Sequence, residues 1–213
     1  MLLQSFLVNT RNSIIRFVSG LRRPSGSANM RLLQECGETL SSFVIREATM
    51  ADVPKIADLH VRTWNETYHS RNSPTYYIRE YQWRQQFENA DGSWFVVVVE
   101  KPGGELIGFA KGMRYAHDDL PEYAGELNKI YLLRSYQRLG LGKQLMMHVT
   151  KRFIDMGIYS MVLFGIPQNP TCYFYEAMGG QRLYGKRGEF HGGYGFPDLR
   201  ALAALGSDEK VFQ

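Results

Sequence analysis

The sequence predicts one α/β domain in which helices cover both faces of a single mixed sheet. Apolar runs and turn signals predict elements in the order β-α-α-β-β-β-α-β-α-β-β, and this interleaving of strands and helices is typical of such a sheet. With 213 residues, of which 44% are hydrophobic and 13% aromatic, the chain is large and apolar enough to bury the core of one domain.

The first half of the chain predicts a strand, two helices and a pair of strands. The strand spans residues 43–46, and a helix of about three turns follows and ends near Trp64. Thr49 occupies the N-cap position of that helix, with Asp52 three residues later. A second helix is expected after Pro74. The apolar run 94–99 predicts the clearest strand, and the turn at residues 101–104 leads into a strand over residues 105–113.

The second half predicts a long amphipathic helix between strands. Residues 126–133 alternate as a strand does, residues 135–142 interrupt the strand, and residues 141–156 repeat apolar side chains at helical spacing. A buried strand over residues 159–166, a short helix over residues 169–178 and a pair of strands within residues 181–199 complete the order.

Residues 1–42 are predicted to be a poorly ordered N-terminal extension. They carry five arginines against two glutamates, a net charge of +3, whereas the remaining residues carry +1. The composition fits a transit peptide or a short amphipathic surface helix, and a plain tail or a start at Met30 stay open as alternatives. The folded domain is expected over residues 43–200, with residues 201–213 as a C-terminal tail.

Charge and cysteine content exclude several classes of function. A nearly neutral domain without a clustered basic face does not fit nucleic-acid binding. Cys36 and Cys172 lie far apart without a CxxC pattern, so neither a disulfide framework nor a metal site is expected. The chain has no run of 18 apolar residues, which excludes a membrane span. Nothing indicates an oxidising compartment, and we expect a cytoplasmic protein.

The segment from Gln137 to Lys143 carries the main chemical signal. It lies between a predicted strand and the long helix, where unpartnered N–H groups and the helix macrodipole favour an anion such as pyrophosphate. Gly140 and Gly142 remove side chains that would hold phosphate oxygens away from the backbone, and Arg138 adds positive charge. The spacing matches neither a dinucleotide fingerprint nor a P-loop.

This turn resembles the Q/R-x-x-G-x-G/A motif of the GCN5-related N-acetyltransferase (GNAT) family. A second family block, in which an asparagine and an alanine precede an aromatic residue, the pair Tyr-Glu and a glycine, is matched by Asn169, Phe174, Tyr175, Glu176 and Gly179, with Cys172 where alanine is usual. The resemblance covers roughly residues 43–200. It implies a mostly antiparallel sheet that is splayed in the middle, with acyl-coenzyme A in the opening between the fourth and fifth strands. Arg134 replaces the proline that the family usually has before the motif, which bears on the acceptor side.

The resemblance implies transfer of an acetyl group from acetyl-CoA directly to the primary amine of a small molecule. No activated nucleophile is evident, so no covalent enzyme intermediate is expected. The residues expected to hold acetyl-CoA are Leu132, Arg134, Gln137, Arg138, Leu139, Gly140, Leu141, Gly142, Lys143 and Asn169.

Two residues are predicted to be catalytic. The family often places its proton donor at the position of Tyr175, which makes Tyr175 the candidate general acid; a packed aromatic residue is the alternative. Glu126 is the candidate base, directly or through water, because period two would put it on the same strand face as Leu132. Asn128 would share that face and bind substrate or water. The alternative for Glu126 is a solvated residue at a strand edge.

The acceptor is less well defined by the sequence. Trp64, Thr67 and Tyr68 form a W-x-x-T-Y pattern that resembles a subgroup containing polyamine and small-amine acetyltransferases, and Trp64 and Tyr68 are expected to bind the substrate. Aromatic faces suit a cationic amine, although packing is the simpler explanation. A protein or peptide N-acetyltransferase and a non-catalytic acyl-CoA sensor stay open, as does a homodimer.

Overall fold

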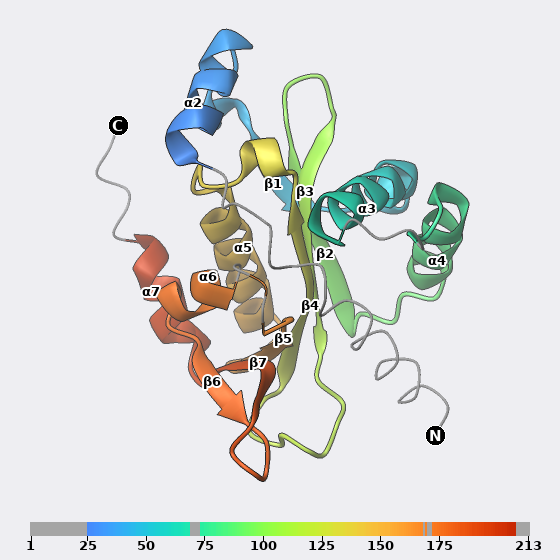
Figure 1. Cartoon of the computed structure of the whole chain (residues 1–213). Helices are drawn as coiled ribbons and strands as arrows, with labels where there is room; N and C mark the ends of the chain where they lie inside the picture. Colours follow the sequence, from blue (N-terminus) through green and yellow to red (C-terminus); the bar gives the residue numbers. More distant parts are fainter. Residues whose placement is uncertain (1–24, 69–72, 168, 170–171, 208–213) are drawn as a thin grey trace.

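The computed structural model describes residues 25–68, 73–167, 169 and 172–207 and has one seven-stranded sheet at its centre (Figure 1). The strand order is β1-β2-β3-β4-β5-β7-β6. All neighbouring strands are antiparallel except β4 and β5, which are parallel. The predicted mixed, mostly antiparallel sheet is therefore confirmed. The strands are β1 (Val44–Glu47), β2 (Trp94–Glu100), β3 (Leu106–Arg114), β4 (Gly125–Leu132), β5 (Met161–Phe164), β6 (Gln181–Tyr184) and β7 (Phe190–Phe196).

Helices cover both faces of the sheet. Figure 1 shows α3 (Val53–Tyr68) and α4 (Tyr76–Glu88) on one face, and α5 (Leu141–Asp155) on the other together with α6 (Cys172–Ala177) and α7 (Leu199–Ser207). The two strands between the helix layers, β2 and β3, are almost completely buried. Among the described helices, none combines the length and the apolar character needed to cross a membrane.

The two ends of the described chain are more ordered than expected. Helix α2 (Gly26–Glu35) and the short turn η2 (Leu40–Ser42) lie within the segment predicted to be poorly ordered, so that prediction is wrong for residues 25–42. The predicted C-terminal tail likewise begins inside α7, where Leu202 is buried. Residues 1–24, which would carry a transit peptide or surface helix, lie outside the described residues.

Thr49 and Asp52 form a capping box at the short turn η3 (Met50–Asp52), which leads directly into α3 at Val53. Thr49 N–H donates to the Asp52 carboxylate at 2.8 Å, and Arg46 on β1 donates to both oxygens of the same carboxylate at 2.8 Å. The bond from Arg46 is the main reason why the pKa of Asp52 is lowered to about 2. The helix continues beyond Trp64 to Tyr68.

A buried polar contact joins α3 and α4 beneath the sheet. Trp83 Nε1 donates to His60 Nδ1 at 3.2 Å, and both side chains are almost completely buried. Burial lowers the pKa of His60 to about 2, so the ring is neutral and accepts the bond. The aromatic run after Trp64 therefore contributes partly to the core, as at Trp83.

Candidate active site

Strands β4 and β5 part soon after they meet. Their ladder consists of two residue pairs, Gly125 with Met161 and Glu126 with Val162. The rest of β4, residues 127–132, continues without a described strand partner on this side, and Figure 1 shows α5 and α6 on the same side of the sheet. This confirms the expected splay, because β4 is not paired with β5 beyond Glu126.

The glycine turn lies at the end of β4. The short turn η4 (Arg134–Tyr136) leads into residues 137–140, and Gly140 forms the N-cap of α5 with φ +85°. The first bond of the helix runs from Gln144 N–H to Gly140 C=O at 3.1 Å. The N–H groups of Leu141 and Gly142 therefore lie in the first turn, where no intrahelical acceptor exists. A Cβ built on Gly140 would meet nothing within 4 Å, so the space beside this turn is open.

Tyr175 is buried on α6, close to the parted strands. Its ring packs against Tyr194 on β7 with centroids 5.6 Å apart, and against Phe174. Burial, followed by the nearby Cys172 and Tyr68, raises its pKa well above the ordinary value. Tyr175 therefore keeps its proton at physiological pH, as a proton donor must.

The candidate base lies beside a β-bulge that the sequence analysis missed. Lys111 on β3 pairs with Lys129, but Gly112 pairs with Leu127, so Asn128 is an extra residue on β4. Because of the extra residue, side chains before and after the bulge no longer alternate in one continuous pattern, so residues an even number apart across it point to opposite faces of the sheet. Glu126 faces α3 and α4, whereas Leu132 faces α5, where its Cδ1 lies over Gly108 next to Leu145. The expectation that Glu126 and Leu132 share one face is therefore wrong.

Asn128 nevertheless meets Glu126. Its Nδ2 donates to Glu126 Oε1 at 2.8 Å, and its Oδ1 accepts a hydrogen bond from Lys129 Nζ at 2.6 Å. The three side chains form a chain of two hydrogen bonds that connects a carboxylate through an amide to an ammonium group. The predicted grouping of Glu126 with Asn128 is thus present, although it arises from the bulge instead of from simple alternation.

Comparison with known proteins connects this geometry to a family. The model of the Acetyltransferase (GNAT) family matches residues 54–180, which include β4, the glycine turn, α5 and α6. The chain belongs to the GNAT family. It is an acetyl-CoA-dependent N-acetyltransferase, as the two sequence motifs predicted.

Several relatives are similar over most of their length. The uncharacterized N-acetyltransferase YuaI of Bacillus subtilis is 33% identical over 173 residues, which cover 76% of this chain and 96% of YuaI. Phosphinothricin N-acetyltransferase of Streptomyces viridochromogenes is 28% identical over 141 residues, or 63% of this chain and 72% of that protein. The crystal structure of PaiA N-acetyltransferase from Thermoplasma acidophilum in complex with coenzyme A superposes with a TM-score of 0.58 at 21% identity, covering 72% of this chain and 98% of that one.

Some of the residues of this GNAT chain that were expected to hold acetyl-CoA already form hydrogen bonds within the protein. Gln137 Nε2 donates to Leu132 C=O at 2.9 Å, and the Glu66 carboxylate accepts Arg134 N–H at 2.8 Å. The backbone C=O of Leu132 and N–H of Arg134, both in residues expected to hold acetyl-CoA, thus have partners inside the protein. Asn169 forms the turn before α6, where its C=O accepts Cys172 N–H at 3.0 Å.

Three cations on the face covered by α3 and α4 were missed by the sequence analysis. They are Arg79 on α4, Lys111 on β3 and Lys129 on β4, and the carboxylate of Glu126 acts on the pKa of both lysines. Burial, then Lys111 and Arg79, lower the pKa of Lys129 to about 8. A lysine in the middle of a buried strand is a detectable signal, since lysine is seldom buried without a role.

The hydrogen-bond partners of these cations are neutral amides. Arg79 donates to Gln82 Oε1 at 3.0 Å, Lys111 to Gln86 Oε1 at 2.6 Å, and Lys129 to Asn128 Oδ1 at 2.6 Å. Such contacts satisfy donors but do not neutralise charge. The face therefore keeps a positive potential beside Glu126.

The predicted substrate residues Trp64 and Tyr68 lie next to these cations. Their rings pack with centroids 4.4 Å apart, and Tyr68 hydrogen-bonds to Tyr131 on β4. The Arg79 guanidinium lies 5.4 Å from the centre of the Trp64 ring. The protein's own arginine thus occupies a position over Trp64 that a cationic substrate would need.

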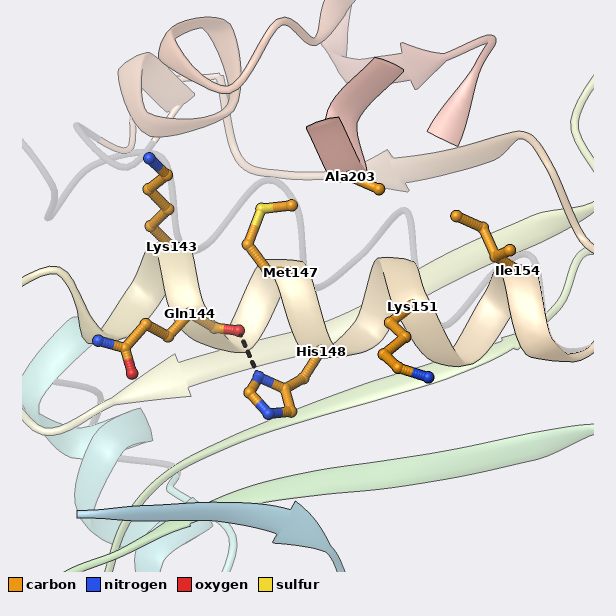
Figure 2. A pocket seen from close by; sticks show the side chains of 7 residues that line it. All are labelled: Lys143, Gln144, Met147, His148, Lys151, Ile154 and Ala203. Atoms are coloured by element: carbon orange, nitrogen blue, oxygen red, sulfur yellow. Dashed lines mark hydrogen bonds between the residues drawn. The ribbon is translucent and has the colours of Figure 1, made fainter. Parts of the chain in front are cut away.

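A separate hollow of about 350 Å³ lies along the outer side of α5, where α7 crosses it (Figure 2). Lys143, at the start of α5, is the one expected cofactor residue among its lining. His148 on this surface contacts Gln144 C=O through Nδ1 at 2.9 Å. Glu126, Asn128 and Tyr175 are not part of this hollow, so it is distinct from the opening between the strands.

Within the described part of the chain, no group of three or more His, Cys, Asp or Glu side chains could hold a metal ion.

Proposed function

We propose that this N-acetyltransferase acetylates the primary amine of a small molecule, with Glu126 as base and Tyr175 as general acid. The observation that carries the proposal is the placement of Tyr175 and Glu126. The buried, protonated tyrosine lies on α6, and the carboxylate that accepts a hydrogen bond from Asn128 lies on β4. Both elements border the opening between β4 and β5. The pyrophosphate of acetyl-CoA would lie at residues 138–143, with the thioester towards β4 and α6.

The roles follow from the needs of the reaction. Glu126, directly or through one water, accepts the proton that the acceptor ammonium must lose before its nitrogen can attack the thioester carbonyl. The attacking nitrogen loses its second proton to solvent, and collapse of the tetrahedral intermediate then forms the neutral amide and breaks the carbon–sulfur bond. Tyr175 gives its proton to the departing sulfur and regains one from solvent. Much of the rate would come from holding the two reactants in line.

For the acceptor, the charges favour an amine that also carries an anionic group. Arg79, Lys111 and Lys129 would attract a carboxylate or phosphinate and repel a polyamine, while Arg79 already covers Trp64. The name of one relative, phosphinothricin N-acetyltransferase, supports a small-molecule acceptor. The polyamine-like acceptor suggested by the W-x-x-T-Y pattern is thus the less favoured version of the proposal.

The test is release of free thiol from acetyl-CoA across a panel of acceptors. The panel contains amino acids with anionic side chains, neutral amino acid amides, spermidine and short peptides, with coenzyme A binding measured by calorimetry in parallel. Release that requires an anionic amine supports the proposal. Thiol release with spermidine or peptides alone would contradict an anionic acceptor and indicate a polyamine or a peptide instead. Coenzyme A binding without thiol release from any acceptor would favour a non-catalytic sensor. The cytoplasmic location and the homodimer stay predictions.

A further inference from the structure

Helix α2 lies outside the segment matched by the family model and packs directly on the glycine turn. Figure 1 shows α2 beside η4, close to the start of α5. Leu33 is buried, and the chain after the helix is held by a cluster in which Glu38 accepts hydrogen bonds from Lys101 Nζ at 3.1 Å and Tyr136 Oη at 3.3 Å. The contact is thus polar and specific.

Asn29 is the central contact between α2 and the turn. Its side chain is 6% exposed, and its amide nitrogen donates to Arg134 C=O at 3.0 Å and to Gln137 C=O at 2.8 Å. One NH₂ group therefore bridges both ends of η4. Arg134 C=O also accepts Gln137 N–H at 3.3 Å, so loss of the Asn29 donor would remove one of the two bonds to Arg134 C=O and the described partner of Gln137 C=O, and would loosen the turn.

Gly26 brings α2 against the next peptide group of the same turn. A Cβ built on Gly26 would lie 2.9 Å from Arg138 O and 3.9 Å from Arg138 C, so the Arg138 carbonyl points at the helix. Arg138 has φ +63°, and no other non-glycine residue among those described has a positive φ. This left-handed conformation is unfavourable for a residue with a side chain and persists where neighbouring structure enforces it.

These contacts fix the direction of the N–H groups in the turn. In a trans peptide, the N–H points opposite to the C=O, and the described chain contains no cis peptide. The peptide of Gln137 C=O carries Arg138 N–H, and the peptide of Arg138 C=O carries Leu139 N–H. With both carbonyls directed at α2, these two N–H groups point away from it, as an anion on the other side of the turn requires.

We infer that helix α2 is a positioning element of the acyl-CoA site, with Asn29 as the positioning residue for the phosphate-binding turn. The inference rests on the proposed function, because it takes the pyrophosphate to lie at this turn. Gly26 and Asn29 both precede Met30, so a chain that began at Met30 would lack both contacts. The role explains why an N-terminal segment beyond the family match is ordered against the turn.

The test uses the full chain with Asn29→Asp, which keeps the shape of the side chain but removes the NH₂ donor and places a carboxylate against two carbonyls. Asn89→Asp is the matched control, since Asn89 Nδ2 also donates to a backbone carbonyl, that of Gln85 at 2.7 Å, at the exposed end of α4. Coenzyme A affinity is measured by calorimetry, and kcat and KM are measured with acetyl-CoA and with S-acetylpantetheine, which lacks the pyrophosphate.

We expect Asn29→Asp to raise the Kd for coenzyme A and the KM for acetyl-CoA by roughly tenfold or more, with kcat at saturation nearly unchanged. Activity with S-acetylpantetheine should equal that of the wild type, and Asn89→Asp should change neither donor. Gly26→Val, which forces the helix away from Arg138, should act in the same direction and gives a second test if Asn29→Asp does not fold.

The outcomes separate this inference from the proposed function. If the wild type does not bind coenzyme A, the proposed function fails whatever the variants do. If the wild type binds and Asn29→Asp binds equally well, or if the variant loses the same factor with both donors, the positioning role is overturned while the proposed function stands.

Discussion

Asn128 donates a hydrogen bond to Glu126 from the extra position of a β-bulge, at 2.8 Å. The bulge turns the strand so that Glu126 lies on the face of Lys111 and Lys129 instead of the face of Leu132. A carboxylate held by an amide and flanked by cations has a defined orientation, which a base acting on a bound amine requires.

Glu126→Gln should lower kcat/KM for the acceptor by about 10²-fold, because glutamine still accepts the Asn128 hydrogen bond but cannot take a proton. Steady-state kinetics at saturating acetyl-CoA measure the effect. Glu122→Gln, in the exposed loop before β4, is the control and should be silent. Wild-type turnover in Glu126→Gln would remove Glu126 from the role of base.

Tyr175→Phe should lower kcat by about 10²-fold and leave the Kd for coenzyme A unchanged, since only the proton donor is lost and the ring packing against Tyr194 is kept. Tyr77→Phe changes a tyrosine that is 78% exposed on α4 and serves as the control. An equal loss of cofactor affinity and turnover would instead indicate a packing role for Tyr175.

Lys129→Met should make the folded state more stable at pH 7. The pKa of Lys129 is about 8 when folded, against 10.5 ordinarily, so between these values the unfolded chain binds a proton that the folded chain has released. The free energy of unfolding of the wild type should therefore rise from pH 8 to pH 10.5. The variant should exceed the wild type in this free energy by roughly 3 kcal/mol at pH 7, and the difference should shrink between pH 8 and pH 10.5.

Urea unfolding of Lys129→Met at a series of pH values measures this dependence. Lys151→Met, at a lysine whose side chain is 76% exposed, is the control and should show no such window. The same Lys129 variant should raise KM selectively for anionic acceptors. A stability gap that does not change with pH would mean that Lys129 is solvated.

Gly112→Ala should cost about 1–3 kcal/mol in the free energy of unfolding. The added Cβ would lie 2.7 Å from Phe95 Cε1 and 2.9 Å from Phe153 Cζ, both in the core between the sheet and α5. Gly142→Ala, whose Cβ would meet Phe174 at an ordinary 3.8 Å, is the matched control for the change in chain entropy. Equal stability of the two variants in urea would contradict the overpacking argument.

The elements with strong local signals were predictable from the sequence. Thr49 and Asp52 marked the turn η3 that leads into α3. Gly140 marked the junction of strand and helix, because few residue types suit its left-handed backbone conformation. The family motifs then located the parted strands and Tyr175.

The features that the sequence missed depend on tertiary contacts. Nothing near Asn128 distinguishes an extra residue from a regular strand, since the bulge is defined by the pairing of Lys111 and Gly112 on another strand. Helix α2 has few apolar residues, and Asn29 gains its partners only from a turn more than 100 positions later in the chain. Neither the alternation of side chains along a strand nor the composition of the chain reveals the bulge at Asn128 or the contacts of Asn29.

The short ladder of two residue pairs between β4 and β5 also affects how the sheet unfolds locally. Few backbone hydrogen bonds cross that joint, and α5, which contacts β2, β3 and α7, is a further connection between the two parts of the sheet. Amide exchange should therefore divide the sheet, with β2 and β3 opening only on global unfolding and β6 and β7 at a lower free energy. A donor molecule along the free edge of β4 would serve as the missing strand, and binding would merge the two exchange classes into one cooperative unit.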